Sequence, residues 1–296
     1  TNTLNLKGND ANVGRLLISS GSAGTTATIV NTGATVNCTY CDFSDITFSS
    51  PVDLSAITGG SGDCGGNSGI TFTTSADQHW ISASGGNWSD ITKWTSRVPL
   101  PQDDVYFDNA FSASQTVTAN MSRLGRSISW TGASGSPTWA AGTQTNYGSL
   151  VLISGMTVSG GTHTFAGRGN YSITSSGKSF SGGIFTAPNG TYTLNDAFSL
   201  TSQFKLTDGT FNAGGFSVTA DNYNISFSTT RTLIMGSGTW TITTNANDFA
   251  WFMATQTNLT FSGSSATIAF ATATGSRSFL GGGATYGTLT YTVAGS

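Results

Sequence analysis

The feature that most constrains the fold is a pattern that recurs at a nearly constant interval in the second half of the chain. Leu206, Leu233 and Leu259 begin similar segments, and the two intervals between them differ by a single position. A second apolar position recurs along the same segments at a similar interval: Val218, Ile242 and Ile268. Self-similarity of this kind is typical of proteins built from stacked repeats.

A unit of this length is too small to bury its own apolar face, so consecutive units must stack and share backbone hydrogen bonds. The apolar residues alternate with Thr, Ser and Asn, which is the period of a strand. The sequence therefore predicts an all-β fold, a parallel β-solenoid (right-handed β-helix) of tandem modules. The three leucines are expected to lie in one column. An antiparallel β-sandwich is the alternative, because it also has short strands and frequent turns.

Composition agrees with an all-β chain and excludes several classes of function. Charged residues make up 8% of the sequence, and the good helix formers Glu, Lys and Arg are absent or scarce. The net charge is −3, and the 11 Lys and Arg are scattered, so we expect no nucleic-acid partner. No apolar run approaches the length of about 20 residues that a membrane-spanning helix needs. Aromatic residues at 11% argue against disorder.

The densest group of Trp, Pro and Asp residues lies at 80–109 and suggests a boundary between two β-structures. We expect residues 1–79 to be the end of a preceding β-helical module, 80–109 to be a junction, and 110–296 to be one continuous solenoid. The last rung is expected to end at Thr292 or Val293. Open strand edges recruit further strands. We therefore expect both ends to be covered, by copies of the chain or by neighbouring structural subunits.

Several segments resemble a family of Gly/Ser/Thr-rich repetitive β-helix proteins of bacteriophages and environmental bacteria. These segments are GGNWSDITKW, VPLPQDDVYFDN, RTLIMGSGTWTIT and SFLGGGATYGTLTYT. The resemblance covers nearly the whole chain. Two departures are Ile81–Ser84, where the family has a Gly pair, and Cys residues at ordinary core positions. The resemblance implies an extracellular or virion-surface location and a structural role, and it brings no catalytic site.

The acidic residues of the junction are the best candidate for a metal site. Asp103 and Asp104 are adjacent, so on a strand they point to opposite faces and cannot form an acid/base pair. With Asp108 they offer clustered oxygen ligands, which Ca²⁺ prefers. The favoured interpretation is that they cap turns by accepting backbone N–H groups. We expect no other cofactor.

Two further groups of residues have both a structural and a functional interpretation. Trp88 and Trp94 suit a sugar-stacking platform, but Trp more often closes the end of an apolar column. Cys38, Cys41 and Cys64 lack the second ligand pair of a zinc site, so we expect buried thiols, or one disulfide to Cys64.

The sequence favours a non-enzymatic fibre or appendage protein, which acts in surface attachment outside a cell or on a virion. Cell-surface glycans are possible partners in that role. A secreted bacterial filament or adhesin is the first alternative. The second is a polysaccharide-degrading β-helix enzyme, which would use clustered carboxylates. The candidates for such carboxylates are isolated in the sequence: Asp196, Asp208, Asp221 and Asp248.

Overall fold

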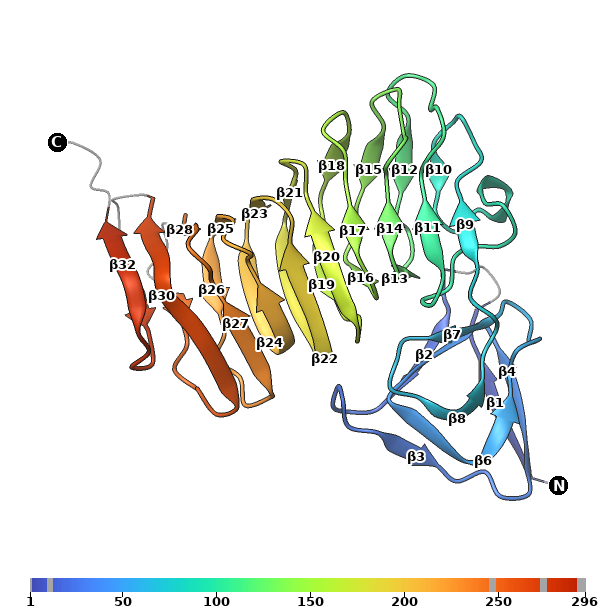
Figure 1. Ribbon diagram of the computed structural model, residues 1–296. Helices are drawn as coiled ribbons and strands as arrows, with labels where there is room; N and C mark the ends of the chain where they lie inside the picture. The colour runs from blue at the N-terminus through green and yellow to red at the C-terminus, as the bar shows by residue number, and fades with distance from the viewer. Residues whose placement is uncertain (1, 10–12, 245–248, 272–275, 292–296) are drawn as a thin grey trace.

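The chain folds into two parallel β-solenoids joined end to side (Figure 1). This computed structural model describes residues 2–9, 13–244, 249–271 and 276–291. The strand ladders that it describes are parallel, and the strands wind through about 12 turns. The expected all-β parallel solenoid is confirmed, and the parallel ladders contradict the β-sandwich alternative.

The short N-terminal solenoid has three parallel sheets, one on each side of a triangular coil (Figure 1). The first sheet contains β1 (Asn2–Lys7) and β4 (Ala34–Thr39). The second contains β2 (Leu16–Ser19), β5 (Cys41–Ser44) and β7 (Ser61–Asp63). The third contains β3 (Ala27–Ile29), β6 (Ile46–Asp53) and β8 (Ser68–Thr71). A core of its own fills the coil, with Phe43, Ile46, Phe48 and Leu54 buried.

The long solenoid also has three faces, and its first face runs along its whole length. That face contains β9 (Asp77–His79), β11 (Asp104–Tyr106), β14 (Ile128–Ser129), β17 (Leu150–Val151), β20 (Asn170–Thr174), the second half of β22 (Gly182–Leu194), the second half of β24 (Gln203–Asn212), β27 (Arg231–Ile234) and the first half of β30 (Leu259–Phe270).

The two other faces complete each turn of the long solenoid. The second face contains β10 (Gly86–Asn87), β12 (Thr116–Thr118), β15 (Thr138–Ala140), β18 (Thr157–Ser159), β21 (Ser179–Phe180), β23 (Phe198–Leu200), β25 (Val218–Ala220), β28 (Thr239–Ile242), the end of β30 and β32 (Tyr286–Tyr291). The third contains β13 (Arg123–Gly125), β16 (Gln144–Asn146), β19 (Thr162–Phe165), the first halves of β22 and β24, β26 (Asn222–Asn224), β29 (Phe249–Phe252) and β31 (Ser278–Leu280).

The expected register of the leucine repeat is wrong. Leu206 lies on the third face, in the first half of β24, whereas Leu233 lies on the first face. Leu259 is on the first face too, but its partner in the neighbouring rung is Arg231. The three leucines therefore do not form one column.

The columns that exist combine different residue types at unequal intervals. On the first face, four apolar side chains occupy one column in successive rungs: Tyr192, Phe211, Leu233 and Phe261. The interval along the chain lengthens from each of these rungs to the next. On the second face Val218 and Ile268 share a column, as expected, but the residue between them is Trp240 and not Ile242. Turns of different lengths change the spacing while the strands keep their alignment.

The structure places the domain boundary before the expected junction. β9 already belongs to the long solenoid, since Gln78 pairs with Val105 of β11. Residues 80–103 therefore complete the first coil of that solenoid, β11 begins the second, and the N-terminal solenoid ends after β8. Thr292 and Val293, where we expected the last rung to end, lie outside the described residues; β32 is the last described strand.

An aromatic cap closes the first coil. Trp88 and Trp94 are 0% and 3% exposed, beside the fully buried Trp80 and Phe107. Trp94 Nε1 donates a hydrogen bond to the carbonyl oxygen of Trp88 over 2.7 Å. A 3-10 turn, η1 (Ile91–Lys93), covers this end of the solenoid beside β9 and β10 (Figure 1). The expected burial of both tryptophans at the end of an apolar column is confirmed.

Candidate functional site

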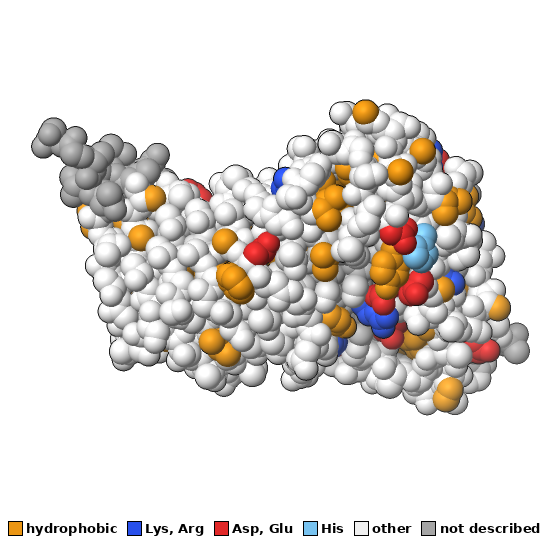
Figure 2. All heavy atoms as spheres, turned by 45° about the horizontal axis from the view of Figure 1, so that its top comes forward, with side chains coloured by type: hydrophobic (Ala, Val, Ile, Leu, Met, Phe, Trp, Pro, Cys, Tyr) orange, Lys and Arg blue, Asp and Glu red, His pale blue; other side chains and the backbone are white. Residues whose placement is uncertain are grey.

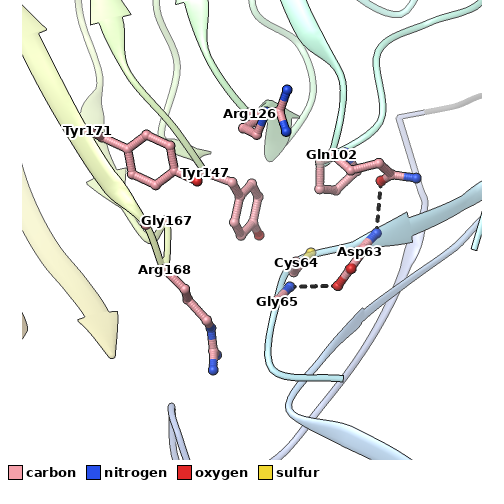
Figure 3. Close-up of a pocket in the computed structure, with 11 residues that line it drawn as sticks. Asp63, Cys64, Gly65, Gln102, Arg126, Tyr147, Gly167, Arg168 and Tyr171 are labelled. Atoms are coloured by element: carbon pink, nitrogen blue, oxygen red, sulfur yellow. Dashed lines mark hydrogen bonds between the residues drawn. The ribbon is translucent and has the colours of Figure 1, made fainter. Parts of the chain in front are cut away.

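The site is a cleft between the two solenoids. One wall of the cleft belongs to the long solenoid. There, three successive turns connect the third face to the first face at one corner. Arg126 follows β13, Tyr147 follows β16, and Gly167 to Gly169 connect β19 to β20. On the other side lies the turn of residues 63–65 between β7 and β8 (Figure 3). The cavity between them has a volume of about 300 Å³.

Buried ion pairs hold the two walls of this cleft together. Asp42 of the N-terminal solenoid is fully buried and accepts hydrogen bonds from Arg15, at 2.7 Å, and from Arg123 of the long solenoid, at 2.6 Å. Asp45 is paired with Arg168 at 2.6 Å. Burial opposes the charge on Arg123, but Asp42 outweighs it and raises the pKa of the guanidinium. A buried charge needs such a partner, because desolvation is costly.

Gln102 forms a third bridge between the modules. Its Nε2 donates to the carbonyl oxygens of Ser61, at 2.9 Å, and Thr73, at 2.8 Å, while its Oε1 accepts the backbone N–H of Asp63 at 2.9 Å. These bonds fix the position of Asp63 relative to the long solenoid. Side chains therefore join the two solenoids at three points: Asp42 with Arg123, Asp45 with Arg168, and Gln102 with β7 and Thr73.

Two tyrosines form apolar surface in the cleft. The rings of Tyr147 and Tyr171 line it, with the Tyr171 hydroxyl directed toward Arg126 and the Tyr147 hydroxyl directed toward Cys64 (Figure 3). Desolvation raises the pKa of both phenols, so both remain protonated at neutral pH. Glycine keeps the space open: a Cβ at Gly167 would lie 2.4 Å from the Tyr171 ring.

A group of charged side chains lies on the surface near the cleft. In Figure 2 acidic, basic and His side chains gather in one region, and the rest of this face carries only scattered charges. Arg126 forms a bidentate pair with Asp104: Nε donates to Oδ1 over 2.8 Å and Nη2 donates to Oδ2 over 2.5 Å. Burial opposes ionisation of Asp104, but Arg126 and the Ser127 N–H outweigh it, and the pKa of Asp104 is lowered. His79 stacks on Tyr106, with ring centroids 4.9 Å apart.

The three carboxylates proposed for Ca²⁺ have separate partners. Asp103 is fully buried, binds Arg97 at 2.5 Å and accepts the backbone N–H groups of Ala76 and Leu100. Asp104 points outward to Arg126, and Asp108 pairs with His79 at 2.8 Å. The expectation that Asp103 and Asp104 lie on opposite faces is confirmed. Asp103 and Asp104 accept backbone N–H groups, as the turn-capping interpretation expected, whereas Asp108 contacts the His79 ring instead.

The other sequence candidates lie in the cores of the solenoids. Trp88 and Trp94 are buried, so neither ring offers the open face that a sugar platform needs. Cys38, Cys41 and Cys64 are buried free thiols, as one interpretation expected, and no disulfide joins them. Cys64 lies at the edge of the cleft beside Tyr147, and burial raises the pKa of its thiol.

The carboxylates considered for an enzyme lie at different places along the long solenoid. Asp196 caps a turn by accepting the N–H groups of Ser175 and Ser176. Asp221 accepts a hydrogen bond from Asn222, and Asp208 is buried, which raises its pKa. Asp248 lies outside the described residues. The described carboxylates of this set do not share a turn.

The cleft is not among the sites predicted from the sequence. The sequence carries one signal for it, because Arg126, Tyr147 and Arg168 recur at two equal intervals along the chain. In a chain that is only 8% charged, two arginines and a tyrosine at one corner of successive coils stand out. The opposite wall comes from another module, and no local pattern predicts that contact.

Comparisons with known proteins add no family to this description. No protein-family model matches the chain, and neither the curated proteins nor the solved structures include a significant match. No helix among the described residues is long and apolar enough to cross a membrane.

Proposed function

We propose that this chain is a rigid structural segment of an extracellular or virion appendage, with a role in surface attachment. The observation that carries the proposal is the buried group of ion pairs around Asp42, which joins the two solenoids. The carboxylate of Asp42 is shared by Arg15 of its own module and Arg123 of the other. A segment that transmits position along an appendage needs its modules fixed relative to one another.

The solenoid architecture supports the same role. Each rung bonds to its neighbours through backbone ladders, and a continuous core runs from the Trp cap to Phe270. The exposed face in Figure 2 carries few charges outside the junction. The resemblance of the GGNWSDITKW and RTLIMGSGTWTIT segments to repetitive β-helix proteins of phages and bacteria points in the same direction.

Immunogold electron microscopy of the native source tests the proposal. Antibodies are raised against the purified chain and applied to intact cells and to virions from the same culture. We expect gold on projections from a virion or a cell surface, and the labelled object separates the phage appendage from the bacterial filament or adhesin. Labelling confined to the cell interior contradicts the proposal.

An assay on polysaccharides separates the structural role from the enzyme alternative. The purified chain is incubated with neutral and acidic polysaccharides, and new reducing ends or unsaturated ends are measured over time. We expect none above a heat-denatured control. Sustained release of either kind of end would contradict a purely structural role.

A further inference from the structure

We propose that the cleft between the two solenoids binds a neutral saccharide of one or two rings. This deepens the attachment role proposed above by naming the site and the class of ligand. It rests on that role only for the biological source of the sugar, because binding itself is a property of the purified chain. The cavity volume, about 300 Å³, is at the lower end of the range for small-molecule sites.

The cleft has the mixed surface that a sugar ring requires. The Tyr147 and Tyr171 rings and the buried Pro101 offer apolar contact for the C–H groups of a pyranose. Tyr171 has its own support, since its ring packs at 5.6 Å from the buried Tyr192. The aromatic wall is therefore held in place before a ligand arrives, which lowers the entropic cost of binding.

Polar groups with unused hydrogen-bonding capacity surround the same space. Arg126 binds Asp104 through Nε and Nη2, and no described residue bonds to its Nη1. Asp63 uses Oδ1 for the Gly65 N–H and for Asn67, while no described residue bonds to its Oδ2. Sugar hydroxyls both donate and accept, so they suit a site that offers both kinds of group.

The charge of the site favours a neutral ligand over an acidic one. The guanidinium groups of Arg126 and Arg168 are each neutralised by a carboxylate, Asp104 and Asp45 respectively. The carboxylate of Asp63 has no ion-pair partner in the part of the chain that the structure describes, which leaves the site with net negative charge. A sugar acid or phosphate would meet this charge without an unpaired cation to offset it.

The test is saturation-transfer-difference NMR on the purified full chain with named probes. The neutral probes are the methyl glycosides of glucose, galactose, mannose, rhamnose and N-acetylglucosamine; the acidic probes are glucuronate and galacturonate. We expect at least one neutral glycoside to receive saturation, with a dissociation constant of roughly millimolar order. No transfer to any neutral probe, or stronger binding of the uronates, would overturn the proposal.

Variants locate the binding in the cleft. Tyr171→Ala is expected to weaken binding of the active glycoside about tenfold or more, equivalent to about 1.4 kcal/mol. Tyr106→Ala, on the same face but outside the cleft, is the matched control and should bind normally. Asp63→Asn keeps an acceptor for Gly65 but replaces the free carboxylate oxygen, and it should also weaken binding. Unchanged binding in both cleft variants would overturn the assignment, and thermal melting checks that each variant is folded.

Failure of this test leaves the appendage proposal intact, because a structural segment needs no ligand in the cleft. The reverse also holds: a chain that binds a neutral glycoside here but is found inside the cell would contradict the appendage role alone. The two experiments therefore fail independently.

Discussion

Arg123 and Asp42 are 81 residues apart in the sequence, yet Arg123 Nε donates to Asp42 Oδ2 over 2.6 Å, across the boundary between the two solenoids. The second partner of Asp42, Arg15, is itself almost fully buried. One carboxylate thus bridges two guanidiniums where a short solenoid meets the side of a long one.

Removal of this carboxylate should be costly. Asp42→Ala leaves Arg15 and Arg123 buried without their counter-charge, so we expect a loss of about 3–5 kcal/mol in the free energy of unfolding. Urea unfolding followed by tryptophan fluorescence and by circular dichroism measures it. Asp53→Ala, at an exposed turn where Asp53 accepts the Ser55 N–H, is the control and should cost much less. Similar losses in both variants would show that the buried carboxylate is not stabilising.

The Trp cap gives a second prediction. Trp88→Ala or Trp94→Ala empties a buried aromatic site, for which about 3–5 kcal/mol is expected. Ile91→Ala changes a side chain on the same cap that is 56% exposed, and it should change stability little. The denaturant midpoints of the three variants, compared with that of the native chain, measure these changes in stability. A melting temperature unchanged by either Trp substitution would contradict the capping role.

Stability should depend on pH through His163. This ring is fully buried between Trp139 and Phe180 and is hydrogen-bonded to Gln144. Burial lowers its pKa from 6.5 to about 3. The unfolded chain therefore binds more protons than the folded chain between these values, and stability must fall as the pH falls through this window.

The variant His163→Gln isolates this effect, because it keeps a polar partner for Gln144 without a titrating ring. The stability of the native chain minus that of the variant should decrease by about 1.4 kcal/mol per pH unit below pH 6.5. Urea unfolding at pH 7, 6, 5 and 4 supplies the values. A difference that is flat across this range would show that His163 is not neutral and buried in the folded state.

The outer rung of the long solenoid predicts self-association of the isolated chain. β32 pairs with β30, and no other described strand pairs with it. Its Leu289 and Tyr291 are 56% and 51% exposed. An open, apolar strand edge recruits further strands, and charge on the strand prevents this. Sedimentation velocity should show concentration-dependent association that Leu289→Lys with Tyr291→Lys reduces. A native chain that stays monomeric at high concentration would contradict the prediction.

The fold class was predictable from the sequence because strand alternation and repetition are local properties. Column membership was not, because it depends on the length of every turn. Leu206 and Leu233 look equivalent in the sequence, but the long strands β24 and β30 each bend across two faces, so equal spacing does not give equal position. The number of residues between two repeat positions does not show how those residues are divided between turns and strands.

The site was less predictable than the fold. The sequence indicates the Asp cluster, and a capping role follows from simple chemistry for Asp103, which accepts the N–H groups of Ala76 and Leu100. The cleft depends on a contact between modules, which Asp42, Asp45 and Gln102 create at long range. Single charges in Gly-rich turns do not reveal their partners.

The most direct test of the account is the distance between the two solenoids, measured by pulsed electron paramagnetic resonance. Spin labels are placed through Thr28→Cys on β3 and Ser179→Cys on β21, two exposed positions, since the three native thiols are buried. We expect one narrow distance distribution in the otherwise native chain and a broader one when Asp42→Ala is added. A broad distribution in the otherwise native chain would contradict the fixed arrangement of the two solenoids on which the proposed function rests.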